Sequence, residues 1–401
     1  MNEKFSVGID LIKGKYARNK KFVIKIIILL IIIILIYLFE NHNLSSVILK
    51  KKYAMNYIKT ILNDYLNNTN YFLSSINEYP NISVIIPLYN CQNSIYLSIS
   101  SILYQNFKNF EIILINDYSN DNTSAIINEL KEKDSRIKII NNQNNMGILY
   151  SRSIGVLSSK GKYIYCLDND DLFYDRFLFN NIYDTAENKD YDIVEFKCFY
   201  VDKYSRQLKL SDIKDSPFNC HPINYSLTQP ELGIFPISKN NKYFSNDYHL
   251  WGKSIKSSIY KKAINMLGKK NYSFYNCWTE DISMLFIIFN IAESFIFLGI
   301  YGIIHIDFKK STTYTLHDSK KLMSELFLLD IIFNFIQNRD CNKIYIIQKF
   351  ISILKSKYIR IINFEHIKYI KILFNKILGI NNLNNIEKTT LRKYLNNLNI
   401  K

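Results

Sequence analysis

Three groups of acidic residues lie beside apolar runs of the sequence, where they could do chemistry together. The groups are Asp117, the D-N-D-D sequence at 168–171, and the pair Glu280 and Asp281. A carboxylate at position 117 can accept a hydrogen bond from a uracil N–H or a ribose hydroxyl, and ordinary turn chemistry explains it equally well.

The D-N-D-D sequence favours a cation. Its carboxylates repel one another unless a cation or solvent compensates them, and hard oxygen ligands suit Mg²⁺ or Mn²⁺, which can bridge a nucleotide diphosphate. Glu280 and Asp281 precede an apolar helix, where the helix dipole favours acidic residues in any case. The functional interpretation of this pair is a general base that deprotonates an acceptor hydroxyl.

Short apolar runs that alternate with helical spacing must position these groups. Strands are predicted at 82–87, 110–115, 137–140, 163–167 and 192–196, and helices at 94–105, around 126–130, at 148–157, at 178–186 and at 282–291. Such alternation is typical of an α/β fold in which helices cover a mostly parallel sheet. Ligands of these sheets bind outside the carboxyl ends of the strands, where acidic residues follow the runs.

The chain outside this alternating region is less regular. Residues 200–250 contain four prolines and predict a loop-rich insertion with room for an acceptor. Residues 294–306 predict either two strands or one bent strand, and 319–375 predicts a helical extension. Packing on the rest of the protein is the favoured role of this extension, and contact with lipid or a lipid-linked acceptor is the alternative.

An apolar run near the N-terminus predicts a membrane anchor. Phe22 to Phe39 contains a single charged residue, Lys25, and no small-residue cleavage site follows it. Because a membrane-spanning helix needs about 20 apolar residues, we expect an uncleaved signal anchor. Basic residues crowd the N-terminal side, which predicts a single-pass membrane protein with a cytosolic N-terminus. Its catalytic region would be luminal (as in the Golgi or ER) or extracytoplasmic.

Composition excludes several other classes. The 51 Lys and Arg against 35 Asp and Glu give a net charge of +16, but the lysines are spread widely, so we expect no nucleic-acid partner. The absence of G-x-G-x-x-G and G-x-x-x-x-G-K-[ST] motifs argues against dinucleotide and P-loop sites. The spacing of the 6 Cys indicates neither a zinc site nor a disulfide framework.

Six ordered motifs between residues 82 and 313 resemble the inverting glycosyltransferases of family 2, which have the GT-A fold. They are SVIIPLYN (83–90), INDYSNDNT (115–123), N-M-G (145–147) with S-R-S-I-G (151–155), G-K-Y-I (161–164) with LDNDD (167–171), H-L-W-G-K (249–253) and T-E-D (279–281). Asn116, Tyr118 and Ser153 replace the Asp, Gly and Asn of the family pattern. These replacements bear on nucleotide affinity rather than on the fold.

The resemblance implies a donor pocket built from several of these motifs. Pro87, Tyr89 and Asp117 would line the nucleoside pocket, and Arg152 would approach the nucleotide. Asp168 would meet the ribose or a metal-bound water.

The resemblance also implies a metal on the diphosphate, either Mn²⁺ or Mg²⁺. Asp170 would hold it, with Asp168 close by and Asp171 in support. His305 would approach the metal, and a core or surface histidine is the alternative interpretation.

On the acceptor side, the resemblance implies that Asp281 is the catalytic base and that Glu280 helps to place the acceptor. Trp251 would stack on a sugar or pack in the core, and Lys253 belongs to the same motif.

The implied reaction transfers a sugar, with inversion, from a nucleotide-sugar (expected to be a UDP-sugar) to a hydroxyl of a glycan, glycoprotein or glycolipid. Competing interpretations are a catalytically inactive nucleotide- or sugar-binding module on the same fold, a nucleotidyltransferase, and a membrane-surface structural protein. The predicted organisation is a cytosolic tail (1–21), a transmembrane helix (22–39), a stem (40–80), a GT-A catalytic domain (81–314) and a helical, basic C-terminal region (315–401).

Overall fold

The structure is a computed structural model that describes residues 78–202, 213–215, 225–228, 249–268, 279–307, 318–336 and 370–376, with the single residues 60 and 389. The predicted cytosolic tail, the predicted membrane span and nearly all of the predicted stem lie outside the described residues. Among the residues that are described, no helix combines the length and the apolar character needed to cross a membrane.

The described residues form one large sheet and its covering helices. The strands are β1 (Ile82–Leu88), β2 (Phe110–Asn116), β3 (Ile137–Asn141), β4 (Tyr163–Cys166), β5 (Leu172–Phe173), β6 (Ile193–Asp202), β7 (Ile213–Asp215), β8 (Tyr225–Thr228), β9 (Lys253–Lys256) and β10 (Ser294–Asp307). The helices are α4 (Ile95–Leu103), α5 (Thr123–Lys133), α6 (Ile148–Ser158), α7 (Leu178–Lys189), α8 (Ser257–Leu267), α9 (Glu280–Ile291) and α11 (Asp318–Ile336).

The sheet has the order β3-β2-β1-β4-β9-β6-β10-β5, with β7 beside β6 and β8 beside β10. Its first four strands pair in parallel, as do β6 and β10, whereas β9 runs antiparallel to both β4 and β6. The predicted α/β architecture with a mostly parallel sheet is therefore confirmed. The region 294–306 is one bent strand, whose register shifts near Gly299 at φ 69°.

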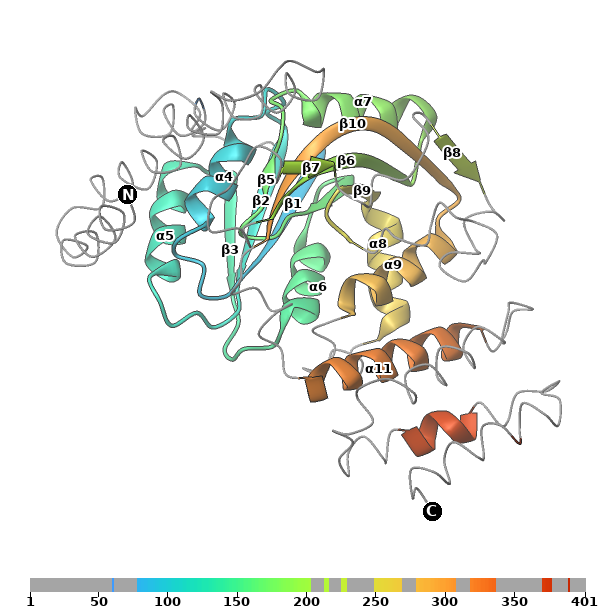
Figure 1. Ribbon diagram of the computed structural model, residues 1–401. Helices are drawn as coiled ribbons and strands as arrows, with labels where there is room; N and C mark the ends of the chain where they lie inside the picture. Colours follow the sequence, from blue (N-terminus) through green and yellow to red (C-terminus); the bar gives the residue numbers. More distant parts are fainter. Residues whose placement is uncertain are drawn as a thin grey trace, which may run out of the picture.

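Both faces of the sheet are buried, which explains why its central strands read as continuous apolar runs. Along β1, Val84 and Ile86 belong to the core beneath α4, α5 and α7, while Ile85 belongs to the core on the opposite face. Helices α6, α8 and α9 cover that opposite face (Figure 1). Alternate side chains thus enter different cores, as the period of two in a strand requires.

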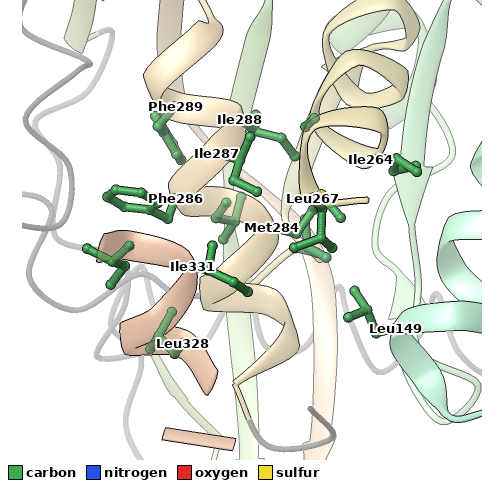
Figure 2. Close-up of a cluster of buried hydrophobic side chains, with 14 of the residues drawn as sticks. Leu149, Ile264, Leu267, Met284, Phe286, Ile287, Ile288, Phe289, Leu328 and Ile331 are labelled. Carbon is green, nitrogen blue, oxygen red and sulfur yellow. The ribbon is translucent and has the colours of Figure 1, made fainter. Parts of the chain in front are cut away.

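Helix α11 extends the core that α6, α8 and α9 form on their face of the sheet. It lies beside α9 (Figure 1), and Leu328 and Ile331 approach Phe286 of α9 (Figure 2). The helical segment 370–376 adds Leu373 to the same core, and Lys376 pairs with Asp330 of α11. The described parts of the C-terminal region therefore pack on the sheet domain, the favoured of its two predicted roles.

The strand register brings the predicted polar segments to one edge. Leu88 lies opposite Asn116, and Ile85 lies opposite Cys166, so the segments that follow β1, β2 and β4 leave the sheet together. Because β9 is antiparallel to β4, the residues just before Lys253 arrive at this same edge. This edge is the place where the sequence predicts the site.

Candidate active site

Asp117 follows β2 and fixes a loop. Its Oδ1 accepts hydrogen bonds from Asn142 Nδ2 at 2.8 Å and from the Met146 N–H at 2.7 Å, and its Oδ2 accepts one from the Gly147 N–H at 2.8 Å. Asn142 also donates to Ser151 Oγ at 2.9 Å, which ties the loop to α6. Asp117 is therefore buried at the predicted edge, next to the start of α6.

Two loops form the rim beside Asp117. The N–H of Asn90 donates to Ser119 Oγ at 3.1 Å, and the N–H of Asn120 donates to Asn90 Oδ1 at 2.9 Å, so the segments after β1 and β2 are joined. Tyr89 and Tyr118 are 49% and 59% exposed on this rim, and Tyr118 adopts φ 63°, a conformation that favours glycine. Two aromatic rings are thus open to solvent beside the predicted nucleoside pocket.

The three carboxylates of the acidic cluster after β4 have different surroundings. Asp168 Oδ1 lies 3.0 Å from Arg152 Nη2. Asp171 is fully buried, where its two oxygens lie 2.9 Å from His305 Nδ1 and one accepts the Ile306 N–H at 3.0 Å. Asn169 Nδ2 donates to the Pro87 carbonyl at 3.4 Å and thereby joins this turn to β1.

Charge compensation in the cluster is incomplete. Burial and the carboxylates of Asp171 and Asp168 raise the pKa of Asp170 to about 8. Burial alone would lower the pKa of His305, but the Asp171 carboxylate outweighs it and raises that pKa to about 9. Among the described side chains, no Lys, Arg or His forms an ion pair with Asp170. Asp170 is therefore the carboxylate of the cluster that a further cation would stabilise most.

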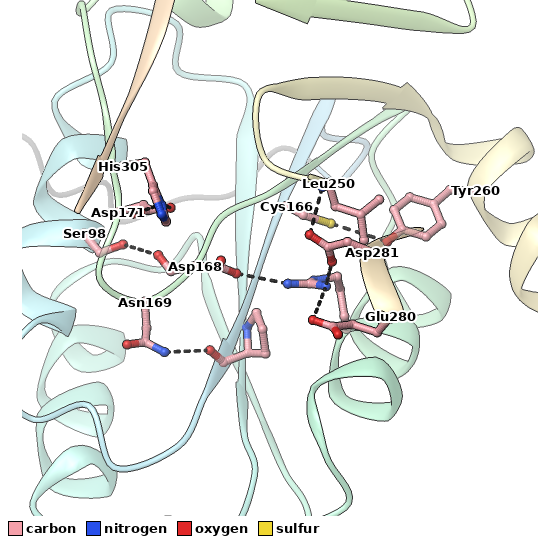
Figure 3. A network of polar contacts seen from close by, with 12 residues as sticks. Ser98, Cys166, Asp168, Asn169, Asp171, Leu250, Tyr260, Glu280, Asp281 and His305 are labelled. Carbon is pink, nitrogen blue, oxygen red and sulfur yellow. Dashed lines mark hydrogen bonds and ion pairs between the residues drawn. The ribbon is translucent and has the colours of Figure 1, made fainter. Parts of the chain in front are cut away.

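Arg152 joins the acidic cluster to the first turn of α9. Its Nη1 lies 2.5 Å from Asp281 Oδ1 and 4.0 Å from Glu280 Oε1, while its Nη2 holds Asp168 (Figure 3). The N–H of Leu250 donates to Asp281 Oδ2 at 3.0 Å. The structure thus brings the predicted Asp168, Arg152, Glu280 and Asp281 together from three separate segments.

Two charges in this group are strongly perturbed. Burial would lower the pKa of Arg152, but Asp281 and Asp168 keep that pKa well above its ordinary value, so the guanidinium stays charged. Burial and the adjacent Asp281 carboxylate raise the pKa of Glu280 to about 8. Glu280 therefore holds a proton at neutral pH and can donate a hydrogen bond, which suits a residue that positions an acceptor.

Trp251 lies inside an aromatic stack. Its ring is stacked at 4.4 Å from the His249 ring and at 4.9 Å from the His305 ring, each with an interplanar angle of 13°. The residue is 5% exposed, so the structure places the indole inside the protein rather than on its surface.

Lys253 is also an internal residue. Its side chain is 1% exposed, and Nζ lies 3.6 Å from Glu195 Oε2 and 3.0 Å from the His249 carbonyl oxygen. In this position Lys253 supports the turn that carries Leu250 and Trp251.

The predicted metal ligands can be tested against these contacts. No three His, Cys, Asp or Glu side chains within the described ranges are already arranged to hold a metal ion. Asp168 forms an ion pair with Arg152. Nδ1 of His305 contacts Asp171, which leaves Nε2 as the ring nitrogen that could meet a metal. Carboxylate and imidazole donors are of the types that suit Mn²⁺ or Mg²⁺, and burial and neighbouring carboxylates raise the pKa of Asp170. The donor types of these residues therefore suit a cation, whereas their arrangement among the described residues forms no complete metal site.

Some contacts within the candidate site were not predicted from the sequence. Asn142 follows β3 at the same edge as the acidic groups, and that position alone could have identified it. The Leu250 N–H and the pairing of His305 with Asp171 had no such signal, because they depend on how β9 and β10 enter the sheet.

Comparison with known proteins identifies the family of the sheet domain. Residues 83–259 match the family described as Glycosyl transferase family 2. The chain is 30% identical over 234 residues to an uncharacterized glycosyltransferase of Haemophilus influenzae, covering 56% of this chain and 66% of that protein. It is 37% identical over 122 residues to the UDP-Glc:alpha-D-GlcNAc-diphosphoundecaprenol beta-1,3-glucosyltransferase WfaP of Escherichia coli, covering 30% of this chain and 47% of that protein. The chain thus matches about half to two thirds of the length of these two relatives.

A solved structure shares the fold. Staphylococcus aureus TarS 1–349 in complex with UDP-GlcNAc superposes with a TM-score of 0.53, covering 74% of this chain and 81% of that chain at 14% identity. The matched family, the curated relatives and the GT-A-like fold agree with one another. This chain therefore carries a glycosyltransferase domain of family 2 at residues 83–259.

Proposed function

We propose that this enzyme transfers a sugar from a UDP-sugar to an acceptor hydroxyl with inversion, using Asp281 as the general base. The observation that carries the proposal is the link between the acidic cluster and the first turn of α9. One guanidinium, that of Arg152, contacts both Asp168 and Asp281. A donor held at the cluster would therefore lie next to a carboxylate able to take a proton.

The proposed reaction is a single displacement at the anomeric carbon. Asp281 accepts the proton of the attacking hydroxyl while the acceptor oxygen bonds to that carbon. The bond from the anomeric carbon to the diphosphate oxygen breaks on the opposite face, which inverts the centre and leaves UDP. Protonated Glu280, beside Asp281, is suited to hold the acceptor by a hydrogen bond.

Asp168, Asp170 and Nε2 of His305 would hold Mn²⁺ or Mg²⁺, and binding of the cation would displace the proton that a pKa of about 9 keeps on His305 at neutral pH. The cation, when bound, supplies charge neutralisation for the departing diphosphate. Pro87, Tyr89 and Asp117 would surround the nucleoside, with Tyr89 offering an exposed ring at the rim.

The acceptor is proposed to be a glycan, a glycoprotein or a glycolipid. The name of WfaP specifies a lipid-linked GlcNAc acceptor for that protein, which supports a lipid-linked glycan here.

We further propose a single-pass anchor at residues 22–39, with the catalytic domain on the luminal or extracytoplasmic side. Membrane extraction and protease protection of the tagged chain would test this topology, and a protein released by carbonate would contradict it.

A panel of nucleotide sugars tests the proposed function. Ligands that bind only the folded state raise the melting temperature. We expect a UDP-sugar to raise it in the presence of Mn²⁺, and the same donor to be consumed when acceptors are supplied. Stabilisation by no nucleotide sugar would contradict the proposal, and binding without any transfer would favour an inactive binding module.

A further inference from the structure

Arg152 lies behind the carboxylates that it contacts. Its side chain is 3% exposed, whereas those of Asp168, Asp281 and Glu280 are 28%, 15% and 13% exposed. A nucleotide entering from solvent would therefore meet the carboxylates before the guanidinium. This burial argues against the direct nucleotide contact that the family resemblance implies for Arg152.

The guanidinium is held through its two Nη atoms. Nη1 donates a hydrogen bond to Asp281, and Nη2 donates one to Asp168. Nε is buried and has no hydrogen-bond partner among the described residues. A planar fork of this kind fixes two acceptors at a set separation, which the single ammonium of a lysine cannot do.

The base is oriented from a second side as well. Asp281 Oδ2 accepts the Leu250 N–H, and Leu250 precedes Trp251, which is stacked against His305. Asp281 is thus restrained by α6 through Arg152 and by the turn before β9 through Leu250 (Figure 3). Its carboxylate has a fixed direction relative to the acidic cluster.

We propose that Arg152 is a positioning residue that holds Asp281 at a fixed separation from Asp168, and so aligns the base with the donor rather than binding the nucleotide. This inference rests on the proposed function for its catalytic consequence, although the clamp itself is a structural claim. Misplacement of a reacting group by about 1 Å can cost on the order of 100-fold in rate, so the loss of the fork would appear in kcat.

The first test is Arg152→Lys in the full 401-residue chain, with Arg136→Lys as the matched control. Arg136 is equally buried and binds both oxygens of Asp134, away from the site. We expect Arg152→Lys to lower kcat about 100-fold and to change the Kd for UDP with Mn²⁺ by less than about threefold. Arg136→Lys should lower the melting temperature and leave kcat unchanged.

Two outcomes would overturn the inference: an unchanged kcat in Arg152→Lys, or a loss of UDP affinity as large as the loss of kcat. The second outcome would make Arg152 a nucleotide contact. If the unaltered protein neither binds UDP nor transfers a sugar, the proposed function fails, and the clamp is then judged by the second test alone.

The second test uses ¹⁵N-arginine-labelled wild-type protein and does not depend on activity. A guanidinium held by carboxylates at both Nη atoms rotates slowly and should give separate Nη signals, identified by their loss in Arg152→Lys. Asp281→Asn should bring these signals towards averaging, while those of Arg136 stay unchanged. Averaged Arg152 signals in the wild type would show that no clamp exists.

Discussion

Nδ1 of His305 lies 2.9 Å from both carboxylate oxygens of Asp171, which joins β10 to the turn after β4. Asp171 is fully buried and also accepts the Ile306 N–H. Its neighbour Asp170 has no such cation among the described residues, and its pKa is raised to about 8. Adjacent aspartates of one motif therefore have opposite electrostatic situations.

This contrast predicts opposite effects of the same substitution. Asp171→Asn should lower the free energy of unfolding by about 3 kcal/mol, because it removes a fully buried carboxylate that His305 and the Ile306 N–H compensate. Asp170→Asn should leave the stability of the metal-free protein unchanged or raise it, because a pKa of about 8 leaves Asp170 protonated at neutral pH, so that Asn replaces one neutral polar side chain with another. Urea unfolding at neutral pH compares the two variants. Greater destabilisation by Asp170→Asn than by Asp171→Asn would contradict the view that Asp171 is the compensated aspartate and Asp170 the uncompensated one.

The same variant, Asp170→Asn, tests whether Asp170 contributes to the predicted metal dependence. We expect Mn²⁺ to raise the melting temperature of the wild type in the presence of UDP, and EDTA to remove that increment. The variant should lose the increment, because it lacks the carboxylate that a cation would stabilise most. Asp184→Asn, on the exposed surface of α7, is the control. An Asp170→Asn variant that keeps the full increment would exclude Asp170 as a ligand.

Glu280 predicts a specific pH dependence of stability. Burial and Asp281 raise its pKa from 4.5 to about 8 in the folded state, so the folded state binds this proton more tightly than the unfolded state does. The resulting stabilisation is fully present below pH 4.5 and is lost as the pH rises through 8. Glu280→Gln cannot titrate and should therefore become more stable relative to the wild type between about pH 5 and about pH 8.

Urea unfolding across this pH range measures the effect, with Glu132→Gln at an exposed position of α5 as the control. The difference in the free energy of unfolding between Glu132→Gln and the wild type should stay constant across this range. Parallel pH curves for Glu280→Gln and the wild type would show that Glu280 is ionised in the folded protein at neutral pH.

The central strands could be predicted from the sequence because both of their faces are buried. β1, β2 and β4 are short apolar runs, and polar residues begin where each run ends, so the acidic positions at the edge followed directly. β9 could not be predicted in the same way, because its sequence K-S-I-K resembles a surface segment. Lys253 is buried there, and its ammonium group meets Glu195 and the His249 carbonyl oxygen.

The partners of the acidic residues were harder to predict than their positions. Arg152 and Asp281 are far apart in the sequence and meet only because α6 and α9 cover the same face of the sheet. The stacking of His305 on Trp251 likewise depends on β10 bringing His305 beside the turn before β9. Contacts between distant segments leave no local pattern in the sequence, so they could not be predicted from it. The roles expected for Arg152 and Trp251 came from the family resemblance instead: a nucleotide contact for Arg152, and a sugar contact as one alternative for Trp251.

The most direct test of the proposed mechanism is Asp281→Asn, with transfer and UDP binding measured on the same preparation. Loss of the general base should lower kcat by about 10²- to 10⁴-fold. The Kd for UDP with Mn²⁺ should stay within about threefold of the wild type, because the substituted group takes the acceptor proton and does not hold the donor. Turnover equal to that of the wild type would contradict the role of Asp281 and, with it, the proposed mechanism.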